Sequence, residues 1–266
     1  MNPLVTSVYD AQPPAERFAP PSRAVLALTR EAIERFGLID KGERVAVALS
    51  GGKDSWLLWS VLDALRAERW LDCELVPVHL DQHQPGFDRA GFEAACEAFG
   101  APCVTVSEDT WTVVEAKLRP GQIPCALCSR MRRGVLNRWC EENGFDKLAL
   151  GHHLQDAIET TLMNLLFGRR LEPMTPLRRG DRTEVAVIRP LLLVEEDKVR
   201  GWQQQHAVPV VPCPVCDPLD DARRATLGAW LDGMRAQQPE LDDAFRTALY
   251  RSDVPERLGL LLVENV

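Results

Sequence analysis

The feature that most constrains the fold is a short apolar run that leads into two glycines and then into an amphipathic stretch. Residues 45–55 read Val-Ala-Val-Ala-Leu-Ser-Gly-Gly-Lys-Asp-Ser, and leucines and a valine follow at helical spacing within residues 56–69. The apolar run predicts a buried strand, and the i, i+3, i+4, i+7 spacing predicts a helix with one buried stripe. The sequence therefore predicts a strand, a glycine turn and a helix in immediate succession.

Gly51 and Gly52 fall in this predicted turn. Glycine lets backbone N–H groups approach an anion without a Cβ in the way, and a helix N-terminus adds partial positive charge and unpaired donors. Ser50, Lys53 and Ser55 offer further donors to phosphate oxygens. The turn is therefore a candidate phosphate-binding loop. The competing interpretation is an ordinary strand-to-helix turn with a polar cap.

Two common phosphate loops are excluded by inspection. The chain has no G-x-x-x-x-G-K-[ST], and no G-x-G-x-x-G follows a predicted strand. The loop reads S-G-G-K-D-S, which matches the PP-loop of the ATP pyrophosphatases, enzymes that split ATP between its α and β phosphates. This match implies ATP as the ligand.

Composition bounds the class of protein. The chain has 266 residues, of which 45% are hydrophobic and 26% are charged, and this suits one large α/β domain or a main domain with a small appendage. No stretch approaches about eighteen consecutive apolar residues, so we expect no membrane span. The N-terminus lacks the basic patch and apolar core of a secretory signal, which favours a cytoplasmic protein with a loosely ordered arm at residues 1–23.

Strand-like and helix-like segments alternate along the rest of the chain. Further strands are predicted at residues 73–80, 102–106, 147–150 and 185–190, and further helices at 88–99, 110–118, 129–143, 154–167, 195–206 and from Arg223 onward. This alternation predicts an α/β fold with a doubly wound, mainly parallel sheet that binds ligands at the carboxyl ends of its strands. We expect a nucleotide-binding domain at residues 24–206 and a cysteine-containing loop with a helical extension at residues 207–266.

The eight cysteines of a cytosolic protein are better explained as metal ligands, reactive thiols or core residues than as disulfides. Two C-x-x-C pairs, Cys125 with Cys128 and Cys213 with Cys216, are each expected on or beside a loop. Thiolates select zinc or iron–sulfur clusters, and thioredoxin-like redox chemistry is a third alternative that the spacing leaves open. The other cysteines are predicted to be core residues: Cys73, Cys96, Cys103 and Cys140.

The formal net charge of −8 argues mildly against a general nucleic-acid binder. Arginines nevertheless gather locally, on the helix predicted at 129–143, beside Gly168, and in a predicted hairpin or loop. They are Arg130, Arg132, Arg133, Arg138, Arg169, Arg170, Arg178, Arg179 and Arg182. Each group alone is typical of a solvated face, whereas several groups near one site would form a phosphate-contacting surface.

A second set of ordered motifs accompanies the phosphate loop. C-x-x-C-S-R-x-R-R-G surrounds the first cysteine pair, Gly-His-His with an aspartate three residues later follows a predicted strand, and P-C-x-x-C comes late in the chain. Residues 80–87 (Leu-Asp-Gln-His-Gln-Pro-Gly-Phe) and 188–191 (Ile-Arg-Pro-Leu) extend the match. From about residue 24 to about residue 240 the chain resembles the TtcA family, which makes 2-thiocytidine in tRNA.

The resemblance implies an ATP-dependent tRNA sulfurtransferase whose partners are tRNA and a cysteine desulfurase, and which forms a homodimer. It implies that the loop from Ser50 to Ser55 binds ATP with Mg²⁺. It also implies a [4Fe–4S] cluster that is held by three cysteines and keeps one iron open for sulfur. The implied cluster ligands are Cys125, Cys128 and Cys213, with Cys216 as a spare thiol, and the implied nucleotide-site residues are Gly151, His152 and Asp156.

The chemistry explains why these groups belong together. If the C2 oxygen of cytosine attacks the α-phosphorus of ATP, pyrophosphate leaves, and a sulfur nucleophile can then displace the oxygen as AMP. Lys53, the N–H groups of the loop and Mg²⁺ would stabilise the charge on the departing pyrophosphate. Asp54 is the expected acidic partner of Mg²⁺, and helix capping is the alternative.

Four further polar residues follow predicted strands. Asp81 either contacts the nucleotide or caps the following loop. His152 and Asp156 would face the same way if a helix begins at His152, and would then position ATP or its metal ion. His153 is expected to be structural.

The sequence departs from the family pattern in two places. Gln155 stands where the first of two acidic residues is usual, and residues 217–219 (Asp-Pro-Leu) replace the usual Gly-Ser-Gln. These departures leave the RNA target open. One alternative is a PP-loop sulfurtransferase for another tRNA base or a small molecule, and another is a non-enzymatic iron–sulfur or zinc protein that binds nucleic acid.

Overall fold

A computed structural model describes residues 21–118, 124–180, 183–206, 210–211, 213 and 222–252. Its elements in chain order are α1 (Arg23–Phe36), β1 (Arg44–Ala48), α2 (Lys53–Ala67), β2 (Glu74–Asp81), α3 (Arg89–Ala98), β3 (Val104–Ser107), α4 (Trp111–Lys117), α5 (Cys125–Glu142), β4 (Lys147–Ala149), α6 (Leu154–Leu166), β5 (Leu177–Arg179), β6 (Ala186–Ile188), α7 (Glu196–His206), α8 (Ala222–Gln237), α9 (Leu241–Arg246) and a π-helical turn η1 (Thr247–Arg251). Strands and helices alternate as the sequence predicts.

The described strands form one sheet in the order β3-β2-β1-β4-β6-β5. The five neighbouring strands β3, β2, β1, β4 and β6 are parallel to one another, and β5 runs antiparallel to β6. The predicted α/β fold with a mainly parallel, doubly wound sheet is confirmed. Strand β1 lies between β2 and β4, where the order of the strands reverses. Its carboxyl end is therefore the switch point at which such sheets bind ligands.

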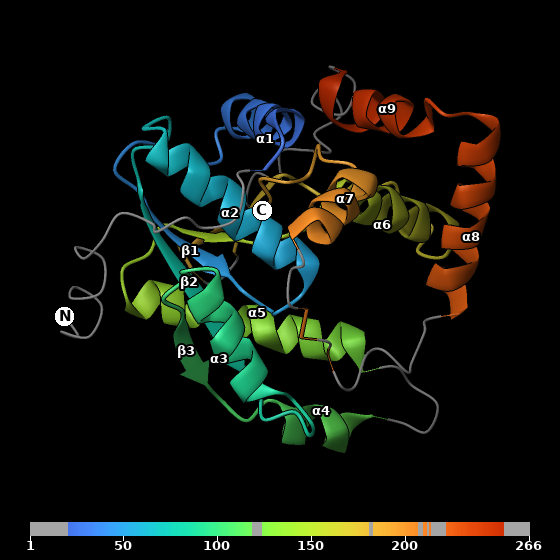
Figure 1. Ribbon diagram of the computed structural model, residues 1–266. Helices are drawn as coiled ribbons and strands as arrows, with labels where there is room; N and C mark the ends of the chain where they lie inside the picture. The colour runs from blue at the N-terminus through green and yellow to red at the C-terminus, as the bar shows by residue number, and fades with distance from the viewer. Residues whose placement is uncertain are drawn as a thin grey trace.

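Different helices cover the two faces of the sheet. On one face, Ala46 of β1 and Val78 of β2 belong to an apolar cluster with Val135 and Leu136 of α5. On the other face, the alternate residues of β1 pack in a larger cluster with α1, α2, α3 and α7. In Figure 1, α5 runs below the sheet while α1 and α2 run above it. The period-two alternation of each strand thus divides the core into two layers.

Two helices differ from the expectation. Helix α5 begins at Cys125, four residues before its predicted start at Ser129, so the first cysteine pair occupies the opening turn of a helix. Helix α1 was missing from the predicted elements, although its signals are present. The Ser22 hydroxyl accepts from the N–H of Val25, and Gly37 ends the helix with φ of +56°, a left-handed conformation that glycine adopts without a Cβ clash.

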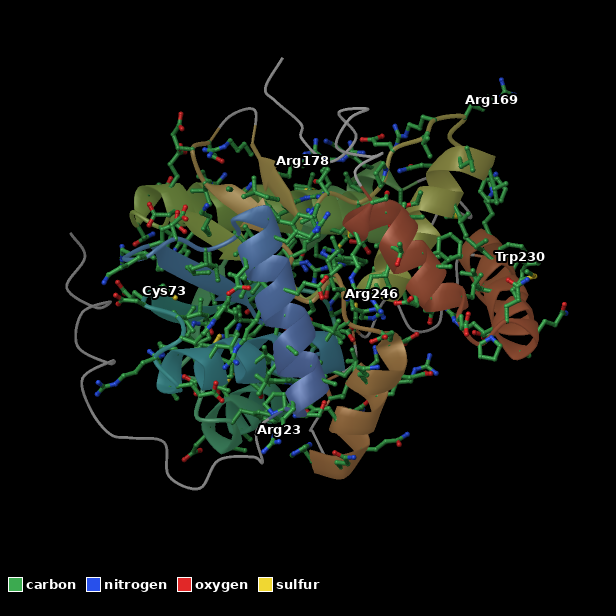
Figure 2. The ribbon with its side chains drawn as sticks, turned by 90° about the horizontal axis from the view of Figure 1, so that it is seen from above. Arg23, Cys73, Arg169, Arg178, Trp230 and Arg246 are labelled. Carbon is green, nitrogen blue, oxygen red and sulfur yellow. The ribbon has the colours of Figure 1, made fainter. Side chains whose placement is uncertain are left out.

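The predicted C-terminal extension is helical where it is described. Helices α8 and α9 pack against α6 and lie at one margin of the molecule (Figure 1). Arg246 of α9 is buried, donates to the carbonyl oxygen of Leu193 at 3.0 Å and pairs with Glu195, so it ties α9 to the entrance of α7 (Figure 2). The expected domain boundaries stay a prediction.

The predicted hairpin or loop that carries Arg178 and Arg179 is confirmed as the β5–β6 hairpin. Residues 1–20 of the predicted arm, Arg182 and Cys216 lie outside the described residues. Among the described helices, none combines the length and the apolar character that a bilayer crossing requires.

Candidate active site

The predicted phosphate loop connects β1 to α2 at the switch point of the sheet. Gly51 has φ of +85°, and α2 begins at Lys53 with Gly52 as its N-cap. The backbone N–H of Ser50 donates to the hydroxyl of Ser55 at 3.2 Å, and that hydroxyl donates to the carbonyl oxygen of Gly52 at 2.8 Å. The two serines therefore close the loop on itself. The N-terminus of α2 has no side-chain cap among the described residues, which leaves backbone donors available for an anion.

Charged side chains gather at the mouth of this loop. The Lys53 ammonium lies 2.7 Å from a carboxylate oxygen of Asp54 and 3.6 Å from one of Glu196, the first residue of α7. The same Asp54 oxygen lies 3.6 Å from Nε2 of His153. The N-cap of α2 is Gly52, so Asp54 does not have the capping role that was the alternative to metal binding. One lysine, two carboxylates and an imidazole thus surround the place where a triphosphate would bind.

Gly151 brings the end of β4 against the start of α2. A Cβ on Gly151 would lie 2.9 Å from the carbonyl carbon and oxygen of Asp54 and 3.1 Å from the backbone nitrogen of Ser55. These are backbone atoms that cannot turn aside, so only glycine permits this approach. The Gly-His-His segment therefore abuts the phosphate loop, as its place at a strand end predicts.

The two histidines point to different neighbours. Helix α6 begins at Leu154 with His153 as its N-cap, so the premise that a helix starts at His152 is wrong. Asp156 accepts the backbone N–H of His153 at 3.0 Å, and Nε2 of His153 lies 3.7 Å from Asp156 as well as near Asp54. The histidine that was expected to be structural is thus the one that faces the phosphate loop.

His152 faces a group of arginines. Burial, the largest cause, and the positive charges of Arg189 and Arg133 together lower the pKa of His152 to about 4, although the charge of Asp156 opposes the shift. Its Nδ1 is buried without a hydrogen-bond partner among the described residues. His152 is therefore neutral at physiological pH.

Three thiols of the two cysteine pairs come together at the start of α5. The side-chain amide of Gln84 donates to the sulfur of Cys128 at 3.3 Å, and the thiol of Cys213 donates to the amide oxygen of Gln84 at 3.7 Å. The thiol of Cys128 also donates to Gln82 at 3.3 Å. Burial raises the pKa of Cys128, Arg132 lowers it, and negative charge on Cys213 or Cys125 raises it further. The three cysteines that the resemblance implies as ligands are therefore neighbours.

The loop after β2 supplies the two amides. His83 has φ of +57°, and its backbone N–H donates to Asp81 at 3.0 Å. This left-handed residue turns the chain so that Gln82 and Gln84, on either side of it, both reach Cys128. Asp81 is itself paired with Arg89. Of the two roles considered for Asp81, its contacts are those of a loop cap.

The phosphate loop is joined directly to the segment that carries Cys213. The backbone N–H of Val211 donates to the carbonyl oxygen of Gly51 at 3.0 Å. A Cβ on Gly51 would lie 3.0 Å from Cβ of Val211 and 3.3 Å from its carbonyl oxygen. Cys213 stands two positions after Val211 in the chain. The phosphate loop and the thiols therefore share one edge of the sheet.

Several functional-site residues escaped the sequence interpretation. Glu196 lies outside every motif of the sequence. Gln84 and Arg189 lie within runs that support the family resemblance but do not by themselves indicate a binding role. The Ile-Arg-Pro-Leu run after a strand was the one signal that could have drawn attention to Arg189. Only the folded chain shows which of these side chains meet.

The cysteines outside the two pairs behave as core residues with one exception. Cys140 is fully buried, and burial raises its pKa to about 12; burial also raises the pKa of Cys73 to about 11. Cys96 and Cys103 were expected to be isolated but lie within hydrogen-bonding distance of each other, and this contact is the main influence on the pKa of both thiols.

Gln155, the residue that departs from the family pattern, links two helices. Its amide nitrogen donates to Glu159 at 2.7 Å, and its amide oxygen accepts from Arg235 of α8, which is also bonded to Asp242 at 2.9 Å. Gln155 therefore connects α6 to α8, and its hydrogen bonds within the described part of the chain do not involve the phosphate loop. This position holds the extension against the domain.

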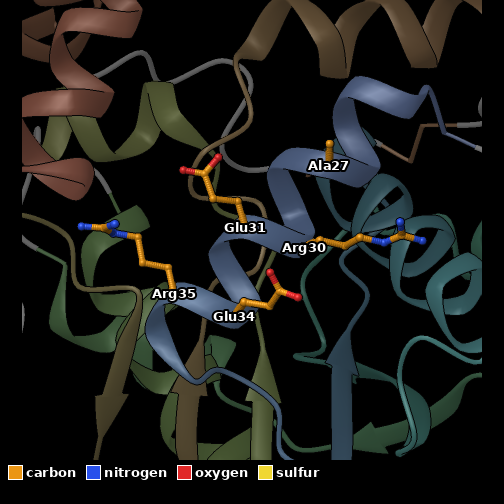
Figure 3. A pocket seen from close by; sticks show the side chains of 5 residues that line it. All are labelled: Ala27, Arg30, Glu31, Glu34 and Arg35. Atoms are coloured by element: carbon orange, nitrogen blue, oxygen red, sulfur yellow. The ribbon is translucent and has the colours of Figure 1, made fainter.

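A shallow hollow on α1 lies apart from these residues. Its lining residues all belong to α1, and Arg30 and Arg35 point to opposite sides of the helix (Figure 3). Arg30 pairs with Glu68, the C-cap residue of α2, and Glu31 lies 2.7 Å from Arg251. These charges are engaged within the fold, so the hollow has no part in the site.

The chain is similar in sequence to proteins of known family. The PP-loop domain family matches residues 24–212. A tRNA-cytidine(32) 2-sulfurtransferase of Deinococcus radiodurans is 40% identical over 240 residues, covering 90% of this chain and 78% of its own length. The protein of the same name from Cupriavidus metallidurans is 36% identical over 234 residues, covering 88% and 74%.

The fold has a counterpart among solved structures. The U34-tRNA thiolase NcsA from Methanococcus maripaludis, solved with its [4Fe–4S] cluster, superimposes with a TM-score of 0.66 at 22% identity, over 90% of this chain and 79% of that one. At this identity the likeness concerns the fold. The match of the phosphate loop and the similarity to the relatives in sequence decide the family. The chain belongs to the PP-loop enzymes and, among them, to the tRNA-cytidine 2-sulfurtransferase family, TtcA.

Proposed function

We propose that this protein is an ATP-dependent sulfurtransferase that replaces the C2 oxygen of a tRNA cytidine with sulfur. The relatives named above carry that activity in their names, at position 32 of tRNA. The observation that carries the proposal is the contact between Val211 and Gly51, because it sets the thiol of Cys213 beside the loop expected to hold ATP. An enzyme that activates an oxygen and then delivers sulfur to the same carbon needs both parts at one place.

The first step activates the base. The C2 oxygen attacks the α-phosphorus of ATP, an oxygen–phosphorus bond forms, and the bond from the α-phosphorus to the bridging oxygen breaks as pyrophosphate leaves. Negative charge grows on the departing pyrophosphate. The N–H groups of Gly51 and Gly52 and the ammonium of Lys53 are the donors that stabilise it, since they are fixed before the reaction starts.

Mg²⁺ belongs to the same step. Asp54 and Glu196 both lie within 3.6 Å of the Lys53 ammonium, and carboxylate oxygens are the ligands that Mg²⁺ prefers. We assign Asp54 as the carboxylate nearest the metal-bound phosphates. Nε2 of His153, 3.6 Å from Asp54, holds that carboxylate in position. Asp156 caps α6 and keeps His153 in place.

The chemistry of the thiols suits an iron–sulfur cluster. Cys128 and Cys213 both bond to the amide of Gln84, and negative charge on Cys213 and Cys125 raises the pKa of Cys128. Thiolates are the ligands of iron–sulfur clusters, and the family resemblance favours a cluster over zinc.

Cys125, Cys128 and Cys213 would hold a [4Fe–4S] cluster. When bound by three thiolates, the cluster supplies one iron free to carry sulfur. Arg132, whose charge lowers the pKa of Cys128, favours the thiolate form that binds iron. The sulfur then adds to C2, the carbon–oxygen bond breaks, and AMP leaves with the former C2 oxygen.

The partners follow from this chemistry. The sulfur atom must come from a donor, for which a cysteine desulfurase is the proposed source. A homodimer and a cytoplasmic location are proposed on the strength of the family resemblance. Cys216, outside the described residues, is proposed as a spare thiol beside the cluster.

Single-residue variants separate the two halves of the site. Lys53→Ala should abolish release of AMP and pyrophosphate while the protein keeps iron and sulfide, because it removes a donor to the leaving group alone. Cys125→Ala or Cys213→Ala should abolish thiolation and lower iron content while ATP still binds. Iron, labile sulfide and nucleotide affinity are measured on anaerobically purified protein. Stoichiometric zinc without iron, or unchanged AMP release by Lys53→Ala, would contradict the proposal.

A further inference from the structure

Three arginines from separate elements converge on the α5 face of the sheet. Arg178 of β5 is paired in register with Val187 of β6, and Arg189 follows two residues after Val187, so both side chains share the face on which Val187 packs. That face is covered by α5, whose Val135 belongs to the same apolar cluster as Val187. Arg133 belongs to the same helix, and its charge acts on both Arg178 and Arg189. We call Arg133, Arg178 and Arg189 the arginine cluster.

The members of the arginine cluster repel one another. Arg189 is 5% exposed, and burial together with the charges of Arg133 and Arg178 lowers its pKa to about 10. Burial also lowers the pKa of Arg133, and Arg178 is the next largest cause. Holding cations together in a buried place is unfavourable unless an anion offsets their charge.

The described part of the chain supplies no anion in contact with the cluster. No carboxylate of the described residues lies within ion-pair distance of Arg133, Arg178 or Arg189. Arg189 donates to the carbonyl oxygen of Thr175 at 2.6 Å, and its Nε is buried without a described partner. The charge of Asp156 is felt at Arg189, but that carboxylate accepts the N–H of His153. A buried guanidinium is thus left with an unused donor.

The position of the arginine cluster relates it to the active site. His152 lies between them, since Arg189 and Arg133 lower its pKa and the preceding Gly151 touches the backbone of Asp54. Lys53 and the phosphate loop lie at the end of β1, whereas the cluster lies beyond β4, at β6 and β5. The loop already offers donors to the triphosphate, so an anion held by the cluster would lie apart from the place expected for ATP.

The cluster also opens to the surface. Its charge runs from the buried Arg189 through the half-buried Arg133 to the exposed Arg178, which Figure 2 shows on the side of the molecule opposite Arg23. A site that is buried at one end and exposed at the other suits a phosphate that belongs to a long chain. Arg guanidinium groups bind phosphate oxygens through paired donors.

We propose that the arginine cluster binds a backbone phosphodiester of the tRNA substrate and so positions the target nucleoside beside the phosphate loop. The inference rests on the proposed tRNA substrate. It assigns to Arg133, Arg178 and Arg189 a role in RNA binding that is separate from ATP binding. Phosphate contacts of this kind fix the register of a nucleic acid without reading its bases.

The test compares Arg133→Ala and Arg178→Ala with Arg138→Ala. Arg138 lies on the same helix as Arg133 but is paired with Glu108, so it is the matched control. The full-length protein is purified anaerobically, and its affinity is measured for an unmodified tRNA transcript and for ATP over a series of salt concentrations. The double variant Arg133→Ala/Arg178→Ala should bind tRNA about tenfold more weakly, with a log–log salt slope smaller by about 1. ATP affinity should match that of the wild type.

Each other outcome counts against the inference in a distinct way. Weaker ATP binding with unchanged tRNA binding would show that the anion is a phosphate of the nucleotide. Unchanged binding of both ligands by the double variant would make the arginine cluster structural. If Arg138→Ala loses as much affinity as the double variant, the effect is one of general charge. If the wild-type protein itself neither binds nor thiolates tRNA, the proposed function has failed and not this inference alone.

Discussion

At the scale of single residues, the local environment decides roles that the residue type leaves open. His152 and His153 are adjacent, yet one faces arginines and the other faces two carboxylates. Because α6 begins one residue after His153, the two side chains leave the backbone in different directions. Their different surroundings give them different electrostatic behaviour.

The lowered pKa of His152 makes stability depend on pH. In the unfolded chain this histidine titrates near about 6.5, whereas in the folded protein burial lowers its pKa to about 4. The unfolded state therefore binds a proton that the folded state refuses between these values. The contribution of neutral His152 to the free energy of unfolding is therefore complete above about pH 6.5. It is lost as the pH falls toward 4, and the loss is at most about 3 kcal/mol.

His152→Asn should remove this loss. Urea unfolding at pH 7.5 and pH 4.5 measures it, with the difference at pH 7.5 serving as the reference for packing effects. The free energy of unfolding of the wild type should fall by more than that of the variant as the pH drops. Equal falls in both proteins would show that His152 takes up its proton as readily in the folded state as in the unfolded chain.

The sequence was sufficient to place residues that directly follow a predicted strand. Ser50 to Ser55, Gly151 and Asp81 follow strands, and parallel strands end at one edge, so their placement could be predicted. The contacts of Asp54 with His153 and of Cys213 with Gln84 could not. They depend on how segments far apart in the chain pack, and no periodicity reports that.

At the scale of elements, the strand-turn-helix unit is the part that the sequence specifies most fully. The apolar run, the glycines and the amphipathic helix all agree, and α2 begins within the predicted turn. The start of α5 was placed too late because the predicted helix was taken to begin after the cysteine pair. Pro124 immediately precedes that helix, a position that needs no backbone N–H, and is the signal for the earlier start.

The contact of the phosphate loop with the Cys213 segment gives a prediction for two neighbouring glycines. Gly51→Ala should destabilise the protein by about 1–3 kcal/mol, since it combines a positive φ with a Cβ 3.0 Å from Val211. It should also weaken ATP binding and lower iron content together, because Val211 leads to Cys213. Urea unfolding, nucleotide affinity and iron analysis are the measurements.

Gly52→Ala is the matched control for this prediction. Its Cβ would meet only the Ser50 hydroxyl at 3.5 Å, an ordinary contact, and its backbone is extended with φ of −78°. We expect a loss of less than about 1 kcal/mol and unchanged iron content. If the two variants were equally stable and retained equal iron, the loop and the Cys213 segment would not be coupled.

At the scale of the whole molecule, the local distribution of charge differs in sign from the net charge. The chain carries a formal net charge of −8, yet Arg133, Arg178 and Arg189 gather on the α5 face with no described carboxylate in contact. Net charge alone would have argued against an RNA substrate, and it is the local distribution that supports one. The thiols and the phosphate loop lie at the carboxyl edge of the sheet, and the arginine cluster lies on its α5 face.

We expect the carboxyl edge of the sheet to work as one site, where ATP activates a cytidine that then receives sulfur. The decisive measurement is nucleoside mass analysis of tRNA after reaction with anaerobically purified protein, ATP and sulfide. We predict 2-thiocytidine that appears only when ATP is present, with AMP released in equal amount. Cleavage of ATP without any thiolated nucleoside, by protein that contains its full iron and sulfide, would contradict it.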